Sequence, residues 1–446
     1  MTIAPTPSPA GLPAEKETTA GNYFVSNYPP FSFWRADRLG EVEAVLNRAP
    51  VAGTPLGLYV HIPFCRKRCH FCYFRVYTDK DSTAIKAYLD LAIRELELYA
   101  GRPFIGGRKP QFVYFGGGTP SYLSESQLQD LGARMKALLP WDAAQEVTFE
   151  CEPGTLTDHK LKTIRDLGVT RLSLGVENFS DHILDINGRA HRSREIRRAY
   201  HFARELEFPQ INIDLIAGMV EETEDNWRHC VRQTIGLAPD SVTIYQMEIP
   251  YNTAIYQEMK AQGKLVAPVA DWETKRRWVS YAFSELEAAG YSVASGYTAV
   301  KNPERTHFVY RDSLWQGADL IGLGVASFSH VGGTHFQNQH DFEPYLARLR
   351  EGRLPLHRAL TPTPEERLIR ELVLQFKLGH VSREYFQRKF GVDILQRFAG
   401  QLADLRSWGA LTLAGDCLRL TREGLLQVDR LVRGFFLPEH RVARYA

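Results

Sequence analysis

Six apolar runs with strand character alternate with helical patterns through the middle of the chain, and no other feature limits the fold so narrowly. The strand candidates are Leu56–Phe64, Gln111–Phe115, Glu146–Cys151, Arg171–Val176, Gln210–Ile216 and Ser241–Met247. The helical patterns between them include Thr83–Tyr99, Glu125–Leu139, Asp158–Leu167 and Arg194–Leu206. Strands and helices that alternate at this spacing form parallel βαβ units. Six units predict an α/β fold with a partial (β/α)6 barrel, in which ligands bind at the carboxyl ends of the strands.

A loop with three cysteines follows the first of these strands. Cys65, Cys69 and Cys72 have the spacing C-x3-C-x2-C, within a string that reads YVHIPFCRKRCHFC. Three thiolates this close together are able to hold three corners of a 4Fe–4S cube, which normally takes four cysteines. The fourth iron then keeps an open position, which is the arrangement needed to chelate S-adenosylmethionine (SAM) by its amino and carboxylate groups. An electron from such a cluster cleaves the sulfonium C–S bond and releases a 5′-deoxyadenosyl radical.

A zinc site or three scattered core cysteines is the alternative interpretation of this loop. Structural zinc sites usually combine two C-x2-C halves, and no second half follows downstream. His61 and His70 would have to complete a zinc set. The position of the loop directly after a first strand favours the iron–sulfur cluster.

The cysteine loop resembles the radical SAM superfamily, and the full string resembles the oxygen-independent coproporphyrinogen III oxidase (HemN-like) family. This family also holds a heme chaperone and class C methyltransferases and cyclopropanases that use two SAM molecules. The resemblance runs from about Tyr23 to the C-terminus. It implies a 4Fe–4S cluster on Cys65, Cys69 and Cys72, one or two SAM molecules, and an electron donor such as a flavodoxin or ferredoxin.

Composition narrows the class of protein further. The 446 residues suffice for two or three domains, and the formal net charge of +2 gives no reason to expect nucleic acid or a membrane surface as a partner. No run of eighteen apolar residues and no signal-peptide core occurs, so neither a membrane span nor export is expected. Three further cysteines, Cys151, Cys230 and Cys417, are isolated in the sequence. This distribution does not match a disulfide framework and therefore favours a cytoplasmic protein.

Four regions are predicted along the chain. Residues 1–22 are rich in Pro, Ala, Thr and Gly and predict a disordered tail. Residues 23–54 form an arm whose first part is dense in aromatic residues and prolines, either packed on the barrel or closing over a substrate mouth. This arm resembles the N-terminal segment of the coproporphyrinogen enzymes, which the heme-chaperone branch lacks. The radical SAM core is expected over residues 55–335 and a C-terminal HemN-like domain over 336–446.

The C-terminal region changes to helices and a hairpin. Thr363, Pro364 and Glu366 have the pattern of a capping box with proline at the first helical position. Alternating residues on either side of Gly415-Asp416 predict a hairpin, and 421–435 predicts a helix. Helices plus a hairpin indicate a winged-helix-like domain. A DNA-binding interpretation is weak because no basic stripe stands out, and the family resemblance implies a lid beside the barrel. Before this region, a further strand is expected at Asp319–Phe328.

Glycines and charged residues stand at the ends of the later strands. The turn Gly116–Thr119 closes the second strand, where glycines let the backbone approach a ligand closely. Acidic residues occur at the third to fifth strands, as Glu150, Glu177 and Asp214, and Arg189 follows the fourth. Because a buried charge needs a partner, these groups together favour a binding site over core positions.

The family resemblance implies SAM-binding roles for most of these positions. It puts Tyr59 and Phe71 beside SAM. The implied SAM contacts are Gly117, Gly118, Thr119, Glu150, Arg189 and Asp214, with Glu177 as a further cofactor-binding candidate. Glu150 and Glu248 are the candidate catalytic carboxylates, with Glu248 as a base if its environment raises its pKa.

Three departures from the coproporphyrinogen oxidase pattern bear on the reaction. Glu177 replaces a Gln, Glu248 replaces a small residue, and the loop lacks a fourth cysteine because Cys72 is followed by Tyr73 and Phe74. The leading hypothesis is oxidative decarboxylation of a tetrapyrrole propionate. The first alternative is methyl transfer or cyclopropanation with a second SAM.

The second alternative is not an enzyme but a heme chaperone. Such a protein needs an exposed axial ligand for the heme iron. The candidate ligands are His61, His70 and His191.

Overall fold

The computed structural model describes residues 17–441 except residues 22 and 265. In this part of the chain a mixed sheet of twelve strands has the order β12-β11-β10-β9-β1-β2-β3-β4-β5-β6-β8-β7. Neighbouring strands from β9 through β6 pair in parallel, whereas β10 to β12 at one end and β8 and β7 at the other are antiparallel. A second sheet, β13-β15-β14, belongs to the C-terminal region.

The strands of the large sheet are β1 (Leu56–Ile62), β2 (Phe112–Gly117), β3 (Glu146–Cys151), β4 (Arg171–Glu177), β5 (Gln210–Ala217), β6 (Ser241–Gln246), β7 (Ser292–Val293), β8 (Thr298–Val300), β9 (Asp319–Leu323), β10 (Phe328–Val331), β11 (Thr334–Asn338) and β12 (Leu356–Leu360). Those of the small sheet are β13 (His380–Ser382), β14 (Leu411–Ala414) and β15 (Cys417–Leu420).

The α-helices up to β12 are α1 (Leu39–Leu46), α2 (Ser82–Ala100), α3 (Glu125–Leu138), α4 (Asp158–Asp166), α5 (Asp181–Ile186), α6 (Ser193–Glu205), α7 (Glu224–Leu237), α8 (Ala254–Ala261), α9 (Trp272–Ala288), α10 (Val309–Trp315) and α11 (Phe342–Arg350). The later ones are α12 (Pro364–Phe376), α13 (Arg383–Phe390), α14 (Ile394–Arg397), α15 (Ala399–Ser407), α16 (Arg422–Leu426) and α17 (Val428–Leu431).

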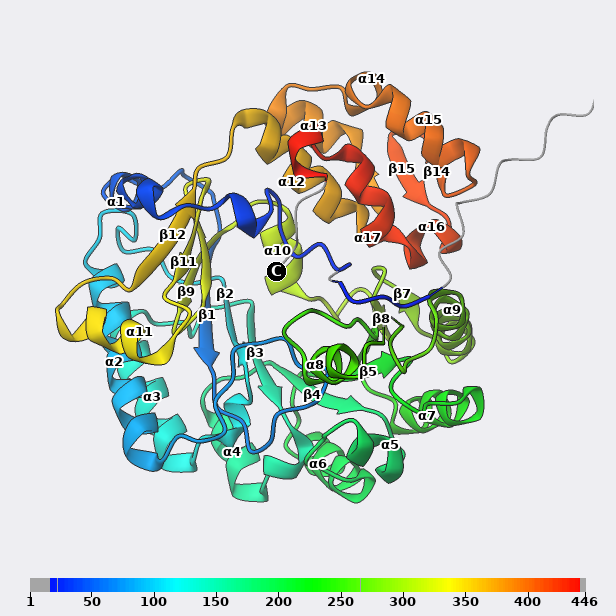
Figure 1. The fold of residues 1–446 in the computed structure, drawn as a ribbon. Coiled ribbons are helices and arrows are strands. Elements are labelled where there is room, and N and C mark those ends of the chain that lie inside the picture. Colours follow the sequence, from blue (N-terminus) through cyan, green and yellow to red (C-terminus); the bar gives the residue numbers. More distant parts are fainter. Residues whose placement is uncertain (1–16, 22, 265, 442–446) are drawn as a thin grey trace, which may run out of the picture.

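The predicted α/β barrel is confirmed. All six predicted strands form, and β3 has the predicted bounds. Helices α2, α3, α4, α6 and α7 line the outer side of the curved sheet (Figure 1). The strands are buried on both faces, as in β1, where Leu58 and Val60 belong to the same apolar core as Leu89 of α2. Burial on both faces is typical of parallel sheets and explains the continuous apolar runs in the sequence.

Two predicted elements are shorter than expected. The run Asp319–Phe328 is not one strand, because Gly324 and Ala326 have positive φ angles of 102° and 61° and turn the chain back into antiparallel β10. The predicted helix over 421–435 is divided into α16, α17 and a 3-10 turn. The capping box at Thr363 and the hairpin of β14 and β15 are confirmed.

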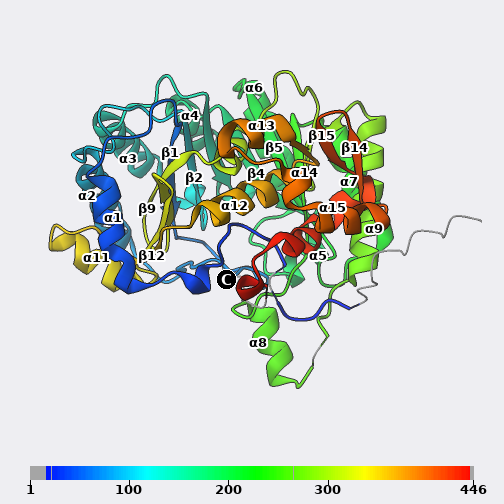
Figure 2. The ribbon, with the colours of Figure 1, turned by 90° about the horizontal axis from the view of Figure 1, so that it is seen from above.

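The N-terminal arm lies between the barrel and the C-terminal helices, as its blue trace shows from two directions (Figures 1 and 2). Val25, Tyr28 and Trp34 are buried. The Val25 N–H donates to Asp429 Oδ1 at 2.8 Å, and Lys377 Nζ donates to the Val25 carbonyl at 2.6 Å. The arm therefore contributes core residues to the junction of barrel and C-terminal region.

The predicted disordered tail, residues 1–22, falls largely outside the described residues. Its described part differs from the prediction: Thr18 is buried and its hydroxyl accepts a hydrogen bond from Lys275 Nζ at 2.7 Å. The hydrogen bond between Thr18 and the buried Lys275 explains why this part of the tail is packed on the protein. The composition of the segment does not indicate such a contact. The other domain boundaries stay predictions. Among the helices described, none has the length and hydrophobicity that a membrane span requires.

Candidate functional site

All the predicted site residues line one cavity of about 920 Å³ at the carboxyl ends of the parallel strands. They are Tyr59, Cys65, Cys69, Phe71, Cys72, Gly117, Gly118, Thr119, Glu150, Glu177, Arg189, Asp214 and Glu248. The cavity continues from the cysteine loop to the N-terminal arm, α10 and α12. Parallel strands bring their carboxyl ends to one edge, which explains why residues almost 200 positions apart meet here.

The cysteine loop is fixed by backbone hydrogen bonds to several elements. The Cys65 N–H donates to the Tyr77 carbonyl at 3.1 Å, and the His70 N–H donates to the Asn187 carbonyl at 3.1 Å. Arg68 Nη2 donates to the carbonyl of Asn252 at 3.1 Å. These contacts hold the loop without help from the arm.

Two of the three sulfurs accept hydrogen bonds from cavity residues. Thr119 Oγ1 donates to Cys65 Sγ at 3.3 Å, and Arg189 Nη1 donates to Cys69 Sγ at 3.2 Å. Burial raises the pKa of the Cys65 thiol to about 11 and that of Cys72 to about 12. Protein groups alone therefore leave these thiols protonated, whereas bound iron would deprotonate them.

The donor set fits an iron–sulfur cluster. Within the described ranges, no three His, Cys, Asp or Glu side chains come close enough to hold one metal ion. A 4Fe–4S cube binds each cysteine through a different iron, so its ligands stand apart around the cluster. Three cysteines on one loop, two of them with hydrogen-bond donors on sulfur, match that requirement.

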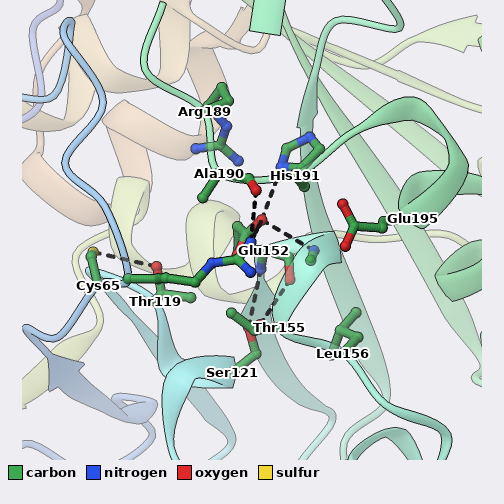
Figure 3. Close-up of polar contacts among 12 residues, drawn as sticks. Cys65, Thr119, Ser121, Glu152, Thr155, Leu156, Arg189, Ala190, His191 and Glu195 are labelled. Carbon is green, nitrogen blue, oxygen red and sulfur yellow. Dashed lines mark hydrogen bonds and ion pairs between the residues drawn. The ribbon is translucent and has the colours of Figure 1, made fainter. Parts of the chain in front are cut away.

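Glu152 connects the cysteine loop to the start of α6 (Figure 3). Its Oε1 accepts from His191 Nδ1 at 3.1 Å, and Arg66 Nη2 lies 3.4 Å from its carboxylate. His191, with Arg189 and Arg66, keeps the pKa of this carboxyl below its usual range although burial opposes this. Glu152 is thus an ionised residue that positions Arg66 within the loop, and the sequence analysis did not single it out.

The glycine turn after β2 is required by packing against β1. A Cβ on Gly117, whose φ is 109°, would lie 2.3 Å from His61 Nδ1, and one on Gly118 would lie 2.9 Å from the Ile62 carbonyl oxygen. Both glycines therefore let the ends of β1 and β2 approach closely. Thr119 follows at once and reaches Cys65, so the turn also positions a sulfur contact.

Three acidic side chains from β3, β4 and β5 converge in the cavity. Glu150 accepts from Tyr114 Oη at 2.5 Å and from the Gly117 N–H at 3.2 Å. Asp214 accepts from Ser173 Oγ at 2.9 Å. Burial raises the pKa of Glu150 to about 7, and burial likewise raises the pKa of Asp214. A cationic ligand such as the SAM sulfonium would relieve this desolvation.

Glu177 lies 3.6 Å from the Arg189 guanidinium and has a positive φ of 62°. Left-handed backbone on a residue with a side chain costs free energy and is enriched at functional sites. Burial raises the pKa of Glu177 to about 7, although Arg189 opposes the shift. Arg189 therefore connects an acid on β4 with a cysteine of the loop.

Two segments of the chain match models of known protein families. Residues 59–233 match the Radical SAM superfamily, and residues 363–426 match the HemN C-terminal domain. The structure of coproporphyrinogen III oxidase (HemN) from Escherichia coli aligns with a TM-score of 0.78 at 23% identity, over 94% of this chain and 99% of that one. The chain belongs to the HemN family of radical SAM proteins. Membership implies a 4Fe–4S cluster and SAM.

Two curated relatives differ in function. The chain is 29% identical over 417 residues to the oxygen-independent coproporphyrinogen III oxidase of Pseudomonas aeruginosa, covering 89% of each protein. It is 28% identical over 389 residues to the heme chaperone HemW of Bacillus subtilis, covering 85% of this chain and 99% of that protein. Similarity to these relatives therefore leaves both branches of the HemN family open, and neither supports methyl transfer.

The three histidines proposed as heme ligands differ in their surroundings. His191 is buried, with its ring nitrogens at 3.1 Å from Glu152 and 3.2 Å from the Val176 carbonyl. His70 Nδ1 lies 3.0 Å from the Ile186 carbonyl. His61 is also buried, and its Nε2 has no hydrogen-bond partner. His191 thus has both ring nitrogens engaged and His61 is buried, whereas His70 is half-buried, so the chaperone alternative stays open.

We expect that Glu150→Ala and Arg189→Ala each weaken SAM binding while the cluster persists. A lost hydrogen bond to a charged group typically costs about 1.5–3 kcal/mol, or roughly 10- to 100-fold in the dissociation constant. Anaerobic calorimetry with the reconstituted protein measures this. Arg192→Ala is the matched control, because Arg192 lies near Arg189 but pairs outside the cavity with Asp185. Unchanged affinity in both cavity variants contradicts the assigned contacts.

Glu248 anchors the arm to the end of β6. Its Oε2 accepts from the Tyr23 N–H at 3.0 Å. Burial, and after it the charge of Asp429, raise the pKa of Glu248 to about 8 from 4.5, although Lys275 and Arg433 oppose the shift. The presence of Glu248 where the coproporphyrinogen oxidases have a small residue can therefore be explained by its contact with the arm, in addition to the predicted role as a catalytic base.

The raised pKa of Glu248 predicts a specific pH dependence of stability. The folded protein retains the Glu248 proton above the unfolded pKa of 4.5, so this residue reduces stability as the pH rises from there through about 8. Glu248→Gln retains an oxygen that accepts from Tyr23. We expect it to raise the melting temperature by about 2 °C or more near pH 9 and to change it little near pH 5. An equal shift at both pH values contradicts the assignment.

Proposed function

We propose that the protein is a radical SAM enzyme that oxidatively decarboxylates a propionate side chain of a coproporphyrinogen-like tetrapyrrole. The observation that carries this proposal is the continuous cavity between the cysteine loop and the aromatic arm. Its volume of about 920 Å³ lies near the upper end of the usual range for ligand sites, about 300–1,000 Å³. A site for SAM plus a bulky substrate requires such a size.

The residues of the cavity have separate roles in this proposal. Cys65, Cys69 and Cys72 hold the cluster. When bound, the cluster and SAM would supply the 5′-deoxyadenosyl radical that abstracts hydrogen from the substrate. Glu150, oriented by Tyr114 and Gly117, suits the methionyl amino group, and Arg189 suits the methionyl carboxylate. Asp214 and Glu177 suit ribose hydroxyl groups, which donate to carboxylates.

The N-terminal arm supports an enzyme more than a chaperone. Tyr23, Phe24 and Trp34 line the cavity. The heme chaperone of B. subtilis is matched over 99% of its length but covers only 85% of this chain, so this chain has segments beyond it. An aromatic wall suits a reaction from which water must be excluded.

Anaerobic turnover of coproporphyrinogen III with SAM and a one-electron reductant tests the proposal. We expect 5′-deoxyadenosine, methionine and carbon dioxide, with a tetrapyrrole product in which a propionate has become a vinyl group. Each conversion removes one hydrogen atom to the deoxyadenosyl radical, carbon dioxide, and one electron that passes to a one-electron acceptor such as the oxidised form of the reductant. With methyl-deuterated SAM, label in the product together with S-adenosylhomocysteine would instead support the two-SAM alternative, in which Glu248 serves as the base. Tight heme binding without any turnover of coproporphyrinogen would support the chaperone.

A further inference from the structure

We propose that Arg358 and Arg370 form a subsite for the propionate carboxylates of the substrate, in the cavity wall made by β12, α12 and the arm. This inference rests on the proposed function, because the ligand is the tetrapyrrole. Both arginines line the same cavity as the cysteine loop. Neither belongs to the positions that the sequence or the family resemblance indicated.

Arg370 is a buried cation among neutral partners. Only 6% of the residue is exposed. Its Nε donates to Asn27 Oδ1 at 2.8 Å, and its Nη1 donates to the Leu314 carbonyl at 3.2 Å. The neighbouring acid, Glu371, is already engaged by Lys389 Nζ at 2.7 Å. Burial lowers the pKa of Arg370 to about 10, as expected for a guanidinium without a carboxylate partner.

Arg358 is half-buried and likewise has neutral hydrogen-bond partners. Its Nε donates to Gln337 Oε1 at 2.7 Å and its Nη1 to the Phe31 carbonyl at 2.9 Å. Burial lowers the pKa of this guanidinium too. Among the described residues, neither Arg358 nor Arg370 has a carboxylate within ion-pair distance. A third arginine of this wall, Arg311, differs, because its Nε lies 2.8 Å from Asp312.

The cavity therefore contains two arginines without a carboxylate partner among the residues that the structure describes. The acids Glu150, Glu177 and Asp214 stand at the strand ends beside the cysteine loop, where the SAM sulfonium would bind. The cations without a counter-ion stand in the wall beside the arm. A buried charge is costly unless it is paired, and a ligand carboxylate would supply the missing partner. Arginine is also the residue whose planar fork binds carboxylates with two hydrogen bonds.

Flat, uncharged rings lie next to the two arginines. Trp34 stacks on His335 at 5.3 Å with an interplanar angle of 20°, and Phe31 stacks on Phe328 at 4.4 Å. His335 Nε2 is buried without a hydrogen-bond partner. Burial lowers the pKa of His335, so the imidazole is neutral. Apolar ring faces with cations at their edge match a macrocycle that carries carboxylates on its rim.

A purely structural role is the competing explanation, since Asn27 and Phe31 belong to the arm. Both contacts use neutral oxygens as acceptors, and an amide side chain donates to such oxygens too. Arg→Gln variants therefore keep a donor for the arm but lose the charge. Binding of anionic and neutral forms of one macrocycle then distinguishes a charge-dependent subsite from an arm anchor.

The test is fluorescence titration of the cluster-loaded protein with coproporphyrin III, the oxidised form of the substrate, which carries four propionates. We expect Arg358→Gln and Arg370→Gln each to weaken its binding about tenfold or more, and Arg370→Lys to weaken it less. The tetramethyl ester of coproporphyrin III should bind wild type weakly and be insensitive to both changes. Mesoporphyrin, with two propionates, shows whether the subsite also serves a heme-like dicarboxylate.

Arg353→Gln is the matched control, because Arg353 is exposed and pairs with Glu351 outside the cavity. Retained cluster absorbance and SAM cleavage without substrate show that each variant is folded. The subsite is overturned if both Gln variants bind coproporphyrin III as tightly as wild type does, or if wild type binds the tetramethyl ester as tightly as the free acid. Turnover of coproporphyrinogen would in either case still uphold the proposed function. Absence of coproporphyrin III binding to wild type overturns the subsite, and absence of coproporphyrinogen turnover in addition overturns the proposed function.

Discussion

Replacing any one of Cys65, Cys69 or Cys72 by alanine is expected to abolish the 4Fe–4S cluster and all reductive cleavage of SAM. The three sulfurs belong to one loop that follows β1 and lines the cavity. Among the described residues, Cys151 is the one further cysteine that lines the cavity. A cube with only two protein ligands lacks the attachment that family members use. Iron content, the visible absorbance near the sulfur-to-iron charge-transfer band and the yield of 5′-deoxyadenosine after reconstitution measure the loss.

Alanine at Cys151, Cys230 or Cys417 provides the control. Cys151 is buried in β3, and Cys230 is buried in α7, where its thiol lies 3.2 Å from Asn178 Oδ1. Cys417 belongs to β15 in the C-terminal region. All three variants should retain the cluster and SAM cleavage. A Cys69→Ala protein with a full 4Fe–4S spectrum and normal activity would falsify the assignment of the ligands.

The barrel could be predicted from the sequence because each of its strands and helices is indicated by the residues of that element itself. Each strand from β1 to β6 is a short segment built around apolar residues, and helices such as α3 begin with a side-chain cap at Ser124. The elements that sequence analysis missed are short or depend on distant contacts. β7 has two residues and β8 has three; β8 pairs with β6 in antiparallel orientation, and β7 in turn pairs with β8. No periodicity is readable over so few residues.

The site could be predicted only in part, for a similar reason. The cysteines and the acids at the strand ends stand out by spacing and by position in a βαβ unit. Tyr114, which donates to Glu150, and Glu152 have no distinguishing pattern in the sequence. Arg358 and Arg370 are more than 280 positions from the cysteine loop, and β12, α12 and the arm bring them to the cavity. The lack of a carboxylate partner for these two arginines can be recognised only in the folded structure.

Deleting residues 1–34 is expected to lower turnover of coproporphyrinogen by about a hundredfold or more, while the cluster and substrate-independent SAM cleavage persist. The deletion removes Val25, Tyr28 and Trp34 from the core, and a large-to-small change of one such residue typically costs about 2–5 kcal/mol. The cysteine loop is held by Tyr77, Asn187 and Asn252, none of which belongs to the arm. Loss of the arm therefore affects the substrate end of the cavity and the C-terminal junction first.

The matched control is deletion of residues 1–16, which leaves Thr18 in contact with Lys275. This shorter deletion should retain turnover and melting temperature. Assays well below the melting temperature of the longer deletion separate loss of the substrate site from unfolding, because SAM cleavage reports on the intact barrel in the same sample. Normal turnover by the longer deletion would mean that the arm neither closes the cavity nor orients Arg358 and Arg370. Loss of both turnover and SAM cleavage would mean that the arm supports the barrel itself. An arm that only covers the substrate end of the cavity would leave SAM cleavage intact.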